Sequence, residues 1–410
     1  MAAVLFGPAV HLLALVACIQ RMEPSELGVL NNCALIPAYL SFAHLGVFTG
    51  LSRQLPLLLG QGEKESARAL EMASSALAWL QGSVLAGGVL SLAVGLWLVG
   101  SSGFRSAAMA ATAATVLQTV VSSHVDVALR GKGDFKRLSL ILWLTHAVNL
   151  GTLLFILKYG AWGAVVRLII SGLVGVLVRI VLGGIRIHWR PNWNSWVGLA
   201  KVGFPLMVSG ALFNLLAVSD RSVVAMLMSD DAAGHFALAG MLLQGFQVVP
   251  QSLSMTLFPK MARAYGEHGD VGRLRPFITR NLVFNILTII PLAWVVHLFV
   301  EPIVTSYFPA YVNGVEPAKM ACFTAGLWIY LGTGSVFGVT GTMRAYLSVL
   351  ATSVAVVWVL GGYFILNDYG LMGAAWARFA GTVLIASYTI WAAYRLTLKS
   401  GSHDGKTSAA

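Results

Sequence analysis

Long apolar segments separated by short polar breaks follow one another along the whole chain. Each is long enough to cross a hydrocarbon layer of about 30 Å as an α-helix. Glycine, proline and charged residues mark the breaks. The pattern predicts about twelve membrane-spanning helices, at 3–20, 28–52, 70–99, 106–129, 138–157, 161–185, 202–226, 233–257, 281–300, 319–339, 346–366 and 371–395.

Composition fits this pattern and leaves no room for a separate soluble domain. Of the 410 residues, 57% are hydrophobic and only 10% are charged, against roughly 25% charged residues in an ordinary soluble domain. The chain is therefore predicted to be an all-α polytopic membrane protein. Its three cysteines lie in or beside apolar segments without metal-like spacing, which indicates packing residues and predicts no metal site and no cofactor.

The net charge of +11 is a topology signal and does not indicate nucleic-acid binding. Nineteen of the 27 Lys and Arg residues fall in alternate connections and in the C-terminal tail, whereas the other connections hold five. The positive-inside rule then places both termini and the basic connections in the cytoplasm. Acidic lipid headgroups are a secondary partner for these charges.

An internal repeat divides the twelve segments into two sets of six. "YGAWGAVVRLI" begins at Tyr159 and "YGLMGAAWARF" begins at Tyr369, 210 residues later. Six is an even number, so both halves enter the membrane from the same side as parallel repeats, with the cleft between two bundles as the expected substrate site. The predicted organisation is a six-helix lobe, a cytoplasmic basic and Trp-rich linker, a second six-helix lobe and a flexible cytoplasmic tail, at 1–185, 186–201, 202–396 and 397–410.

The linker carries three tryptophans beside basic residues. Trp189, Trp193 and Trp196 stand near Arg186 and Arg190. Aromatic and basic side chains together at this depth are typical of a headgroup belt, and a specific partner site is the alternative.

Several ordered motifs resemble a known family. They are "LGVLNNCALIPAYLSFAHLGVFTGLSRQLPLLLGQGE", the stretch from "SDRSVVAMLMSDDAAGHFAL" to "FPKMARAYGE", and "YGLMGAAWA". In order and spacing they are similar to the polysaccharide or O-antigen flippases of the multidrug/oligosaccharidyl-lipid/polysaccharide exporter superfamily. The chain departs from that family at His44, where an acidic residue is common, and at His235-Phe236, where an aromatic pair is usual.

The resemblance implies a carrier rather than an enzyme. Such a carrier moves an undecaprenyl-diphosphate-linked oligosaccharide from the inner to the outer leaflet of a bacterial cytoplasmic membrane, for surface polysaccharides such as O-antigen and lipopolysaccharide. A polysaccharide polymerase and glycosyltransferases are the partners it implies, and the coupling ion, H⁺ or Na⁺, is left open. The alternatives are a cation-coupled multidrug exporter of the same superfamily, and a membrane-embedded polymerase or acyltransferase.

An anionic diphosphate needs fixed cations along its path, and a guanidinium binds phosphate oxygens bidentately. The cleft candidates are Arg53, Arg167, Arg378, Asp220, Arg221 and His44. Snorkelling to headgroups is the alternative for Arg167 and Arg378, a cap or a salt bridge between the halves for Asp220 and Arg221, and proton coupling is a further role for His44. The glycine-to-arginine spacing is four residues at Gly163–Arg167 and five at Gly373–Arg378, so the two guanidinium groups need not face one cleft.

Two further charged sites have structural interpretations. Asp126 and Arg130 are spaced i, i+4 and are predicted to neutralise each other at the inner end of the fourth span. Arg179, near the cytoplasmic face, is predicted to snorkel. The mid-span residues His11, His146, Asn149 and Asn214 are read as interhelical hydrogen-bonding groups or as functional ones.

Overall fold

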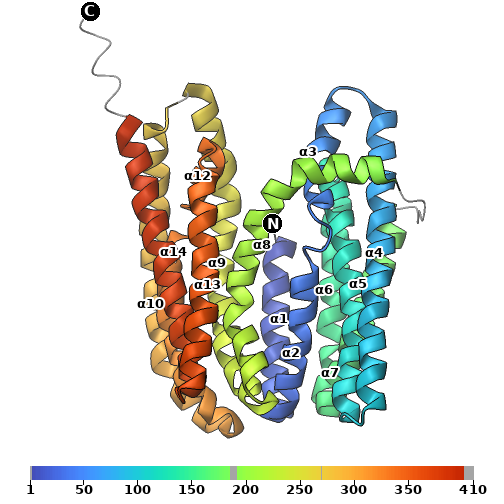
Figure 1. The fold of residues 1–410 in the computed structure, drawn as a ribbon, viewed down its shortest axis with the longest axis vertical. Coiled ribbons are helices and arrows are strands. Elements are labelled where there is room, and N and C mark those ends of the chain that lie inside the picture. The colour runs from blue at the N-terminus through green and yellow to red at the C-terminus, as the bar shows by residue number, and fades with distance from the viewer. Residues whose placement is uncertain (1, 185–191, 269, 401–410) are drawn as a thin grey trace, which may run out of the picture. The chain divides into compact units, whose positions relative to one another are not determined.

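The computed structural model describes residues 2–184, 192–268 and 270–400, and within these ranges the chain is helical without strands (Figure 1). Contacts divide it into two compact units, Met1–Leu215 (unit 1) and Leu216–Ala410 (unit 2). The helices confirm the predicted all-α class. Unit 1 contains α1 Ala2–Arg21, α2 Pro24–Leu40, α3 Val47–Gly60, α4 Lys64–Leu98, α5 Gly103–Gly131, α6 Phe135–Gly151 and α7 Leu153–Gly183.

Helix α8, Trp193–Leu227, begins in unit 1 and ends in unit 2, so the chain passes between the units inside a helix. Domain boundaries at residues 185 and 202 stay a prediction, and linker residues 185–191 and tail residues 401–410 lie outside the described part. The remaining elements of unit 2 are α9 Asp230–His268, η1 Gly272–Leu274, α10 Arg275–Tyr307, η2 Pro309–Gly314, α11 Val315–Gly326, η3 Leu327–Tyr330, α12 Ser335–Thr340, α13 Met343–Leu366 and α14 Gly370–Ser400.

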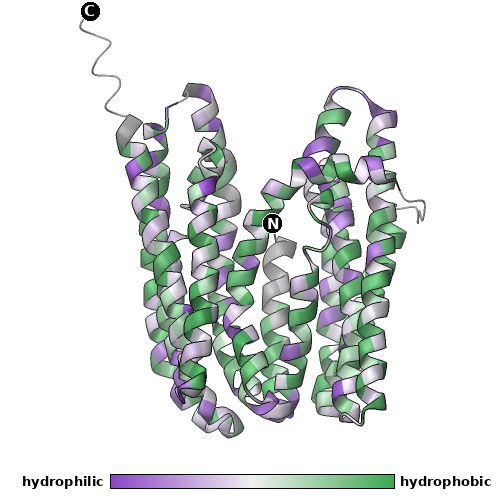
Figure 2. Cartoon of the chain, viewed as in Figure 1, coloured by the Kyte–Doolittle hydropathy of each residue, from purple (hydrophilic) through white to green (hydrophobic). Residues whose placement is uncertain are grey.

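Hydrophobic residues predominate along these helices (Figure 2), and many of the large ones are exposed. Along α10, for example, Leu287, Trp294 and Phe299 are all more than half exposed. A contiguous apolar surface of this kind suits lipid and not water. Seven helical stretches of the described chain are long and apolar enough to span a membrane unaided: Lys64–Leu98, Leu153–Gly183, Trp193–Leu227, Gly272–Tyr307, Pro309–Thr340, Met343–Leu366 and Gly370–Leu398.

The first glycine of the repeated Tyr-Gly motif has a left-handed φ in both units. Gly160, inside α7, and Gly370, at the start of α14, both have φ of 56°. The second glycine of each motif lies tight against the helical segment before the turn, since a Cβ at Gly163 would overlap the Phe155 carbonyl and one at Gly373 would lie 2.6 Å from the Phe364 Cβ. The repeat is therefore a pair of tight reversals that only glycine accommodates.

The second predicted span is broken between α2 and α3. Residues 41–46 form successive turns, in which Leu45 and Gly46 have φ of 47° and 90°. Helix α8 covers this break closely, because a Cβ at Gly203 would overlap the Gly46 carbonyl and the Gly50 amide. The Asn214 amide Nδ2 also donates to the Ala38 carbonyl at 3.0 Å. Irregular backbone is tolerated at membrane depth where protein covers it in this way.

The tenth predicted span is broken as well, between η3 and α12. The side-chain amide of Asn281 donates to the Leu331 carbonyl at 2.9 Å, and that of Asn285 donates to the carbonyls of Ile329 and Leu331, both at 3.1 Å. Both asparagines are buried on α10. They satisfy carbonyl groups that the helix break leaves without partners.

Replacing Asn285 by alanine should lower the free energy of unfolding by about 2 kcal/mol, because the Ile329 carbonyl loses its donor in an apolar environment. The measurement is the thermal unfolding of the purified protein in detergent. Asn194→Ala, at an exposed site on α8, is the matched control and should leave the midpoint unchanged. Equal midpoints for the two variants would contradict this role of Asn285.

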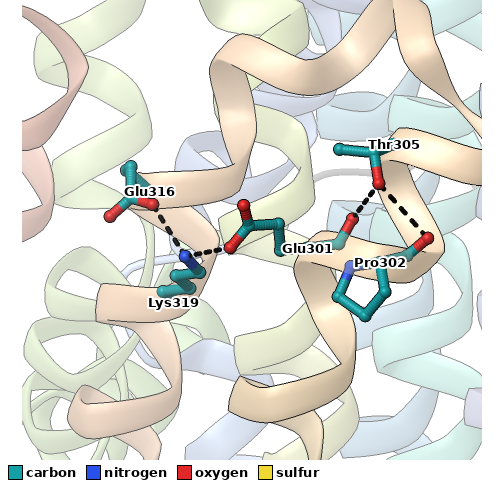
Figure 3. Close-up of polar contacts among 5 residues, drawn as sticks. All are labelled: Glu301, Pro302, Thr305, Glu316 and Lys319. Carbon is teal, nitrogen blue, oxygen red and sulfur yellow. Dashed lines mark hydrogen bonds and ion pairs between the residues drawn. The ribbon is translucent and has the colours of Figure 1, made fainter.

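The long connection after α10 is held by a charged cluster (Figure 3). The Lys319 ammonium, on α11, contacts the Glu301 carboxylate at 2.5 Å and the Glu316 carboxylate at 2.9 Å. The glutamates are more than half exposed, so screening leaves this cluster a small contribution to stability. Its geometric effect is to join the end of α10 to the start of α11.

Trp196, near the start of α8, does not occupy the headgroup position predicted for it. Its side chain is buried, and its indole Nε1 donates to the Ala73 carbonyl at 2.7 Å. Trp193 is 70% exposed, as a headgroup residue would be. Trp196 therefore anchors the start of α8 to α4, and the headgroup interpretation is wrong for this residue.

Candidate functional site

A cavity of about 200 Å³ lies inside unit 1, among α1, α2, α5 and α7. Its wall is mostly apolar, with a few polar side chains reaching it. They are Asn31 on α2, Thr112 and Thr115 on α5, and Arg167 on α7. We call this space the Arg167 cavity. Mostly apolar walls with few polar groups are typical of a ligand pocket.

Arg167 reaches the cavity because α7 restarts after the Gly160 turn. Its Nη2 donates to the Asn149 Oδ1 at 3.3 Å, and the Asn149 amide in turn donates to the Thr145 carbonyl at 2.8 Å. Its Nε is buried without a hydrogen-bond partner. Within the described residues no carboxylate pairs with this guanidinium, so the cavity carries an uncompensated positive charge.

Among the described lining residues of the Arg167 cavity, the buried side-chain atoms without a hydrogen-bond partner are donors. The Thr112 and Thr115 hydroxyls already donate to the backbone carbonyls of Ala108 and Thr112, at 2.8 Å each. The Asn31 amide Nδ2 is buried and without a partner. Such a site favours water or an anionic group over a metal cation.

Arg378 is the corresponding cation in unit 2. It lies on α14, is 5% exposed, and its Nε and Nη1 have no hydrogen-bond partner. The structure records no ion pair for it in the part of the chain it describes. Arg378 therefore points into protein instead of snorkelling to the surface. Among the described residues, neither it nor the half-buried Arg167 forms an ion pair with a carboxylate.

Asp220 and Arg221 lie on the part of α8 that belongs to unit 2. Asp220 is 2% exposed and its Oδ1 has no hydrogen-bond partner. Arg221 is half-buried, packs against Gly240 of α9, and its Nη2 contacts the Ala217 carbonyl at 3.4 Å. Asp220 is thus a buried carboxylate, and the neighbouring Arg221 is positioned by Gly240 and by the Ala217 carbonyl.

His44 and Arg53 belong to the broken second span. The His44 Nδ1 accepts the Gly46 amide at 3.1 Å, and the ring packs on Phe48 with centroids 4.6 Å apart. Proton uptake at Nδ1 would break that bond and loosen the turn. Arg53 is exposed on α3. The binding roles of all six predicted residues stay predictions.

The predicted pairing of Asp126 with Arg130 is wrong. The Asp126 carboxylate instead forms an ion pair across helices with Arg179 of α7, at 3.7 Å, and the Arg179 Nη1 also donates to the Gly175 carbonyl at 3.2 Å. Arg179 is 4% exposed, so it does not snorkel. A buried cation takes the nearest carboxylate in space, which here lies on another helix.

Sequence reasoning missed Asn31, Thr112 and Thr115. The signal available was an asparagine in the middle of an apolar segment, which is by default a candidate functional group. The two threonines gave no signal, because hydroxyls in membrane helices usually bond their own backbone. Asn281 and Asn285 were missed for a different reason, since they stand at the inner start of their span.

A protein family and a curated relative match this chain in sequence. The family model described as "Polysaccharide biosynthesis protein" matches residues 68–310. The probable multidrug resistance protein NorM of Thermotoga maritima is 21% identical over 283 residues, which are 63% of this chain and 60% of that protein. The alignment thus spans less than two thirds of that relative.

Two solved structures of a multidrug resistance MATE family transporter of the MOP superfamily have a similar fold. The inward-facing one gives a TM-score of 0.77 at 16% identity, over 98% of this chain and 96% of the other. The outward-facing one gives 0.67 at 16% identity, over 98% and 95%. The similarity extends over nearly the whole of both chains and confirms the predicted fold class, an all-α multi-pass membrane protein of about twelve helices.

Family membership follows from the extent of the match. Because the family model covers more than half of the chain, this protein belongs to the polysaccharide biosynthesis protein family.

Proposed function

We propose that the protein is a flippase that moves an undecaprenyl-diphosphate-linked oligosaccharide across the bacterial cytoplasmic membrane by alternating access. The observation that carries the proposal is the arginine in each unit, half-buried Arg167 and buried Arg378, that has a buried nitrogen without a hydrogen-bond partner and no carboxylate partner among the described residues. A cation held in this state offers its charge to a mobile anion. Membership in a family of polysaccharide biosynthesis proteins supports the same substrate class.

The test is a reconstituted assay. The purified protein is placed in liposomes with a polyprenyl-diphosphate oligosaccharide, and translocation is followed by an impermeant sugar-modifying reagent. Arg167→Ala and Arg378→Ala should each reduce the initial rate about tenfold or more, since a hydrogen bond to a charged group is worth about 1.5–3 kcal/mol. Arg105→Ala and Arg344→Ala, at exposed sites of units 1 and 2, are the matched controls and should keep the wild-type rate.

Full rates for both buried-site variants at equal protein level would contradict the cationic path. Loss of surface polysaccharide in cells carrying the same variants, with normal membrane levels of the protein, would support the proposal independently.

A second candidate is a cation-coupled exporter of organic cations. Asp220 favours it, because a buried carboxylate with a free oxygen is the group such coupling needs. The names of the NorM relative and of the MATE structures point the same way. Asp220→Asn in liposomes loaded with a fluorescent cation distinguishes the two: abolished cation export together with unchanged lipid translocation would favour the exporter.

A further inference from the structure

A second cavity, of about 480 Å³, lies in unit 1 at the end that carries the connection between α3 and α4. It is separate from the Arg167 cavity and shares no lining residue with it. Helices α3, α4 and α5 form its walls. We call it the basic pocket and define it by the polar residues Lys64, Arg68, Glu71, Ser75, His124 and Lys132.

His124, on α5, is the most deeply buried polar residue that lines the basic pocket. His124 is 1% exposed, and its Nδ1 lies 3.0 Å from the Ser74 Oγ. In the Nε2–H tautomer, the Ser74 hydroxyl donates to Nδ1 and the ring's remaining N–H is at Nε2. That Nε2 is buried without a hydrogen-bond partner. An unpaired buried N–H in a cavity wall is costly unless a ligand or water accepts from it.

The exposed part of the pocket is positively charged. Lys64, Arg68 and Lys132 are exposed around it, and Glu71 is the only acidic residue among the lining residues described. The Lys132 ammonium contacts the Glu71 carboxylate at 2.5 Å, which leaves the charges of Lys64 and Arg68 uncompensated. Two cations above a buried N–H form a site for an oxyanion.

Apolar side chains complete the wall of the basic pocket and indicate that the anionic group belongs to a ligand with an apolar part. Leu59 and Met72 line the same pocket and are 36% and 40% exposed. Adjacent Leu57 is 53% exposed. A ligand that is anionic at one end and apolar at the other satisfies both surfaces, and basic pockets between membrane helices bind lipid headgroups.

We propose that the basic pocket binds the phosphate-bearing headgroup of an anionic lipid, with Lys64 and Arg68 pairing with phosphoryl oxygens and the His124 Nε2–H donating to one of them. The inference does not require the transport reaction proposed above. A polyprenyl diphosphate is one ligand with this chemistry, and an anionic phospholipid is another.

The experiment measures binding to the full-length protein in detergent. The probes are dioctanoyl phosphatidic acid, dioctanoylglycerol, which lacks the phosphate, and inorganic diphosphate, which lacks the lipid. The test variant Lys64→Gln/Arg68→Gln changes exposed side chains and so preserves folding. Its matched control, Lys136→Gln/Lys201→Gln, removes two exposed charges outside the pocket. His124→Leu is a second variant, and its ligand binding is compared with wild type when its thermal midpoint shows that it folds normally.

We expect the test variant to bind phosphatidic acid at least tenfold more weakly, the control variant to bind it as wild type does, and dioctanoylglycerol not to bind. Diphosphate binding with the same dependence on the variant would support recognition of the phosphoryl group alone, whereas binding of the lipid only would support a ligand that enters from the membrane. Equal affinity in the test and control variants, or equal binding of dioctanoylglycerol, would overturn the inference. Lipid binding without translocation would leave this site standing and count against the flippase.

Discussion

Replacing Gly203 by alanine should destabilise the protein by about 3 kcal/mol or prevent its folding. A Cβ at this position overlaps the backbone of Gly46 and Gly50, and backbone atoms cannot move aside as a flexible side chain can. Helix α8 would have to withdraw from the break in the second span. That withdrawal also removes the bond from Asn214 to the Ala38 carbonyl.

The measurement is the yield of monodisperse protein in detergent and its thermal midpoint. Gly198→Ala is the matched control on the same helix, because a Cβ there meets no atom within 4 Å. It should leave stability unchanged or raise it by up to about 1 kcal/mol, since alanine is the better helix former. Only Gly203→Ala is expected to lower stability, and a Gly203→Ala variant as stable as the wild type would show that the contact is not close.

Replacing Asp126 by leucine should also lower the stability of the protein strongly. It leaves the Arg179 guanidinium buried without a carboxylate, and breaking such a pair costs about 3–5 kcal/mol. We expect about 3 kcal/mol, because the Asp126 side chain is 21% exposed and water partly compensates.

A double variant separates the contribution of the Asp126–Arg179 ion pair to stability from the contributions of the two side chains alone. Asp126→Leu/Arg179→Met removes both charges and should recover most of the lost stability, measured by the same thermal unfolding. Arg130→Met, at the position once expected to pair with Asp126, should have little effect. Additive losses in the double variant would mean that the ion pair does not carry the effect.

The regular parts of this fold could be predicted from hydropathy because lipid imposes a simple rule on every spanning helix. The repeat at Tyr159 and Tyr369 could be found from the sequence, whereas the positive φ of its glycines is seen only in the structure. The breaks at 41–46 and after η3 were not predictable, because distant helices supply the compensating contacts: α8 covers the first and α10 the second. Local periodicity carries no record of those contacts.

The candidate site was predictable in part. A guanidinium inside an apolar segment is conspicuous, so Arg167 and Arg378 were found, and both have buried nitrogens without partners. Their surroundings were not found, because a cavity is formed by several helices and leaves no local pattern. The basic pocket was hidden among loop charges that the topology rule already explains.

The close contact between Gly46 and Gly203 sets an order for biogenesis. The ribosome completes α2 and α3 more than a hundred residues before it completes α8, so the turn at 41–46 is exposed to lipid, or to an insertase, until α8 arrives. A fragment that stops at residue 185 lacks this cover. Separate expression of the first bundle should therefore extend through residue 215, where the contacts of unit 1 end.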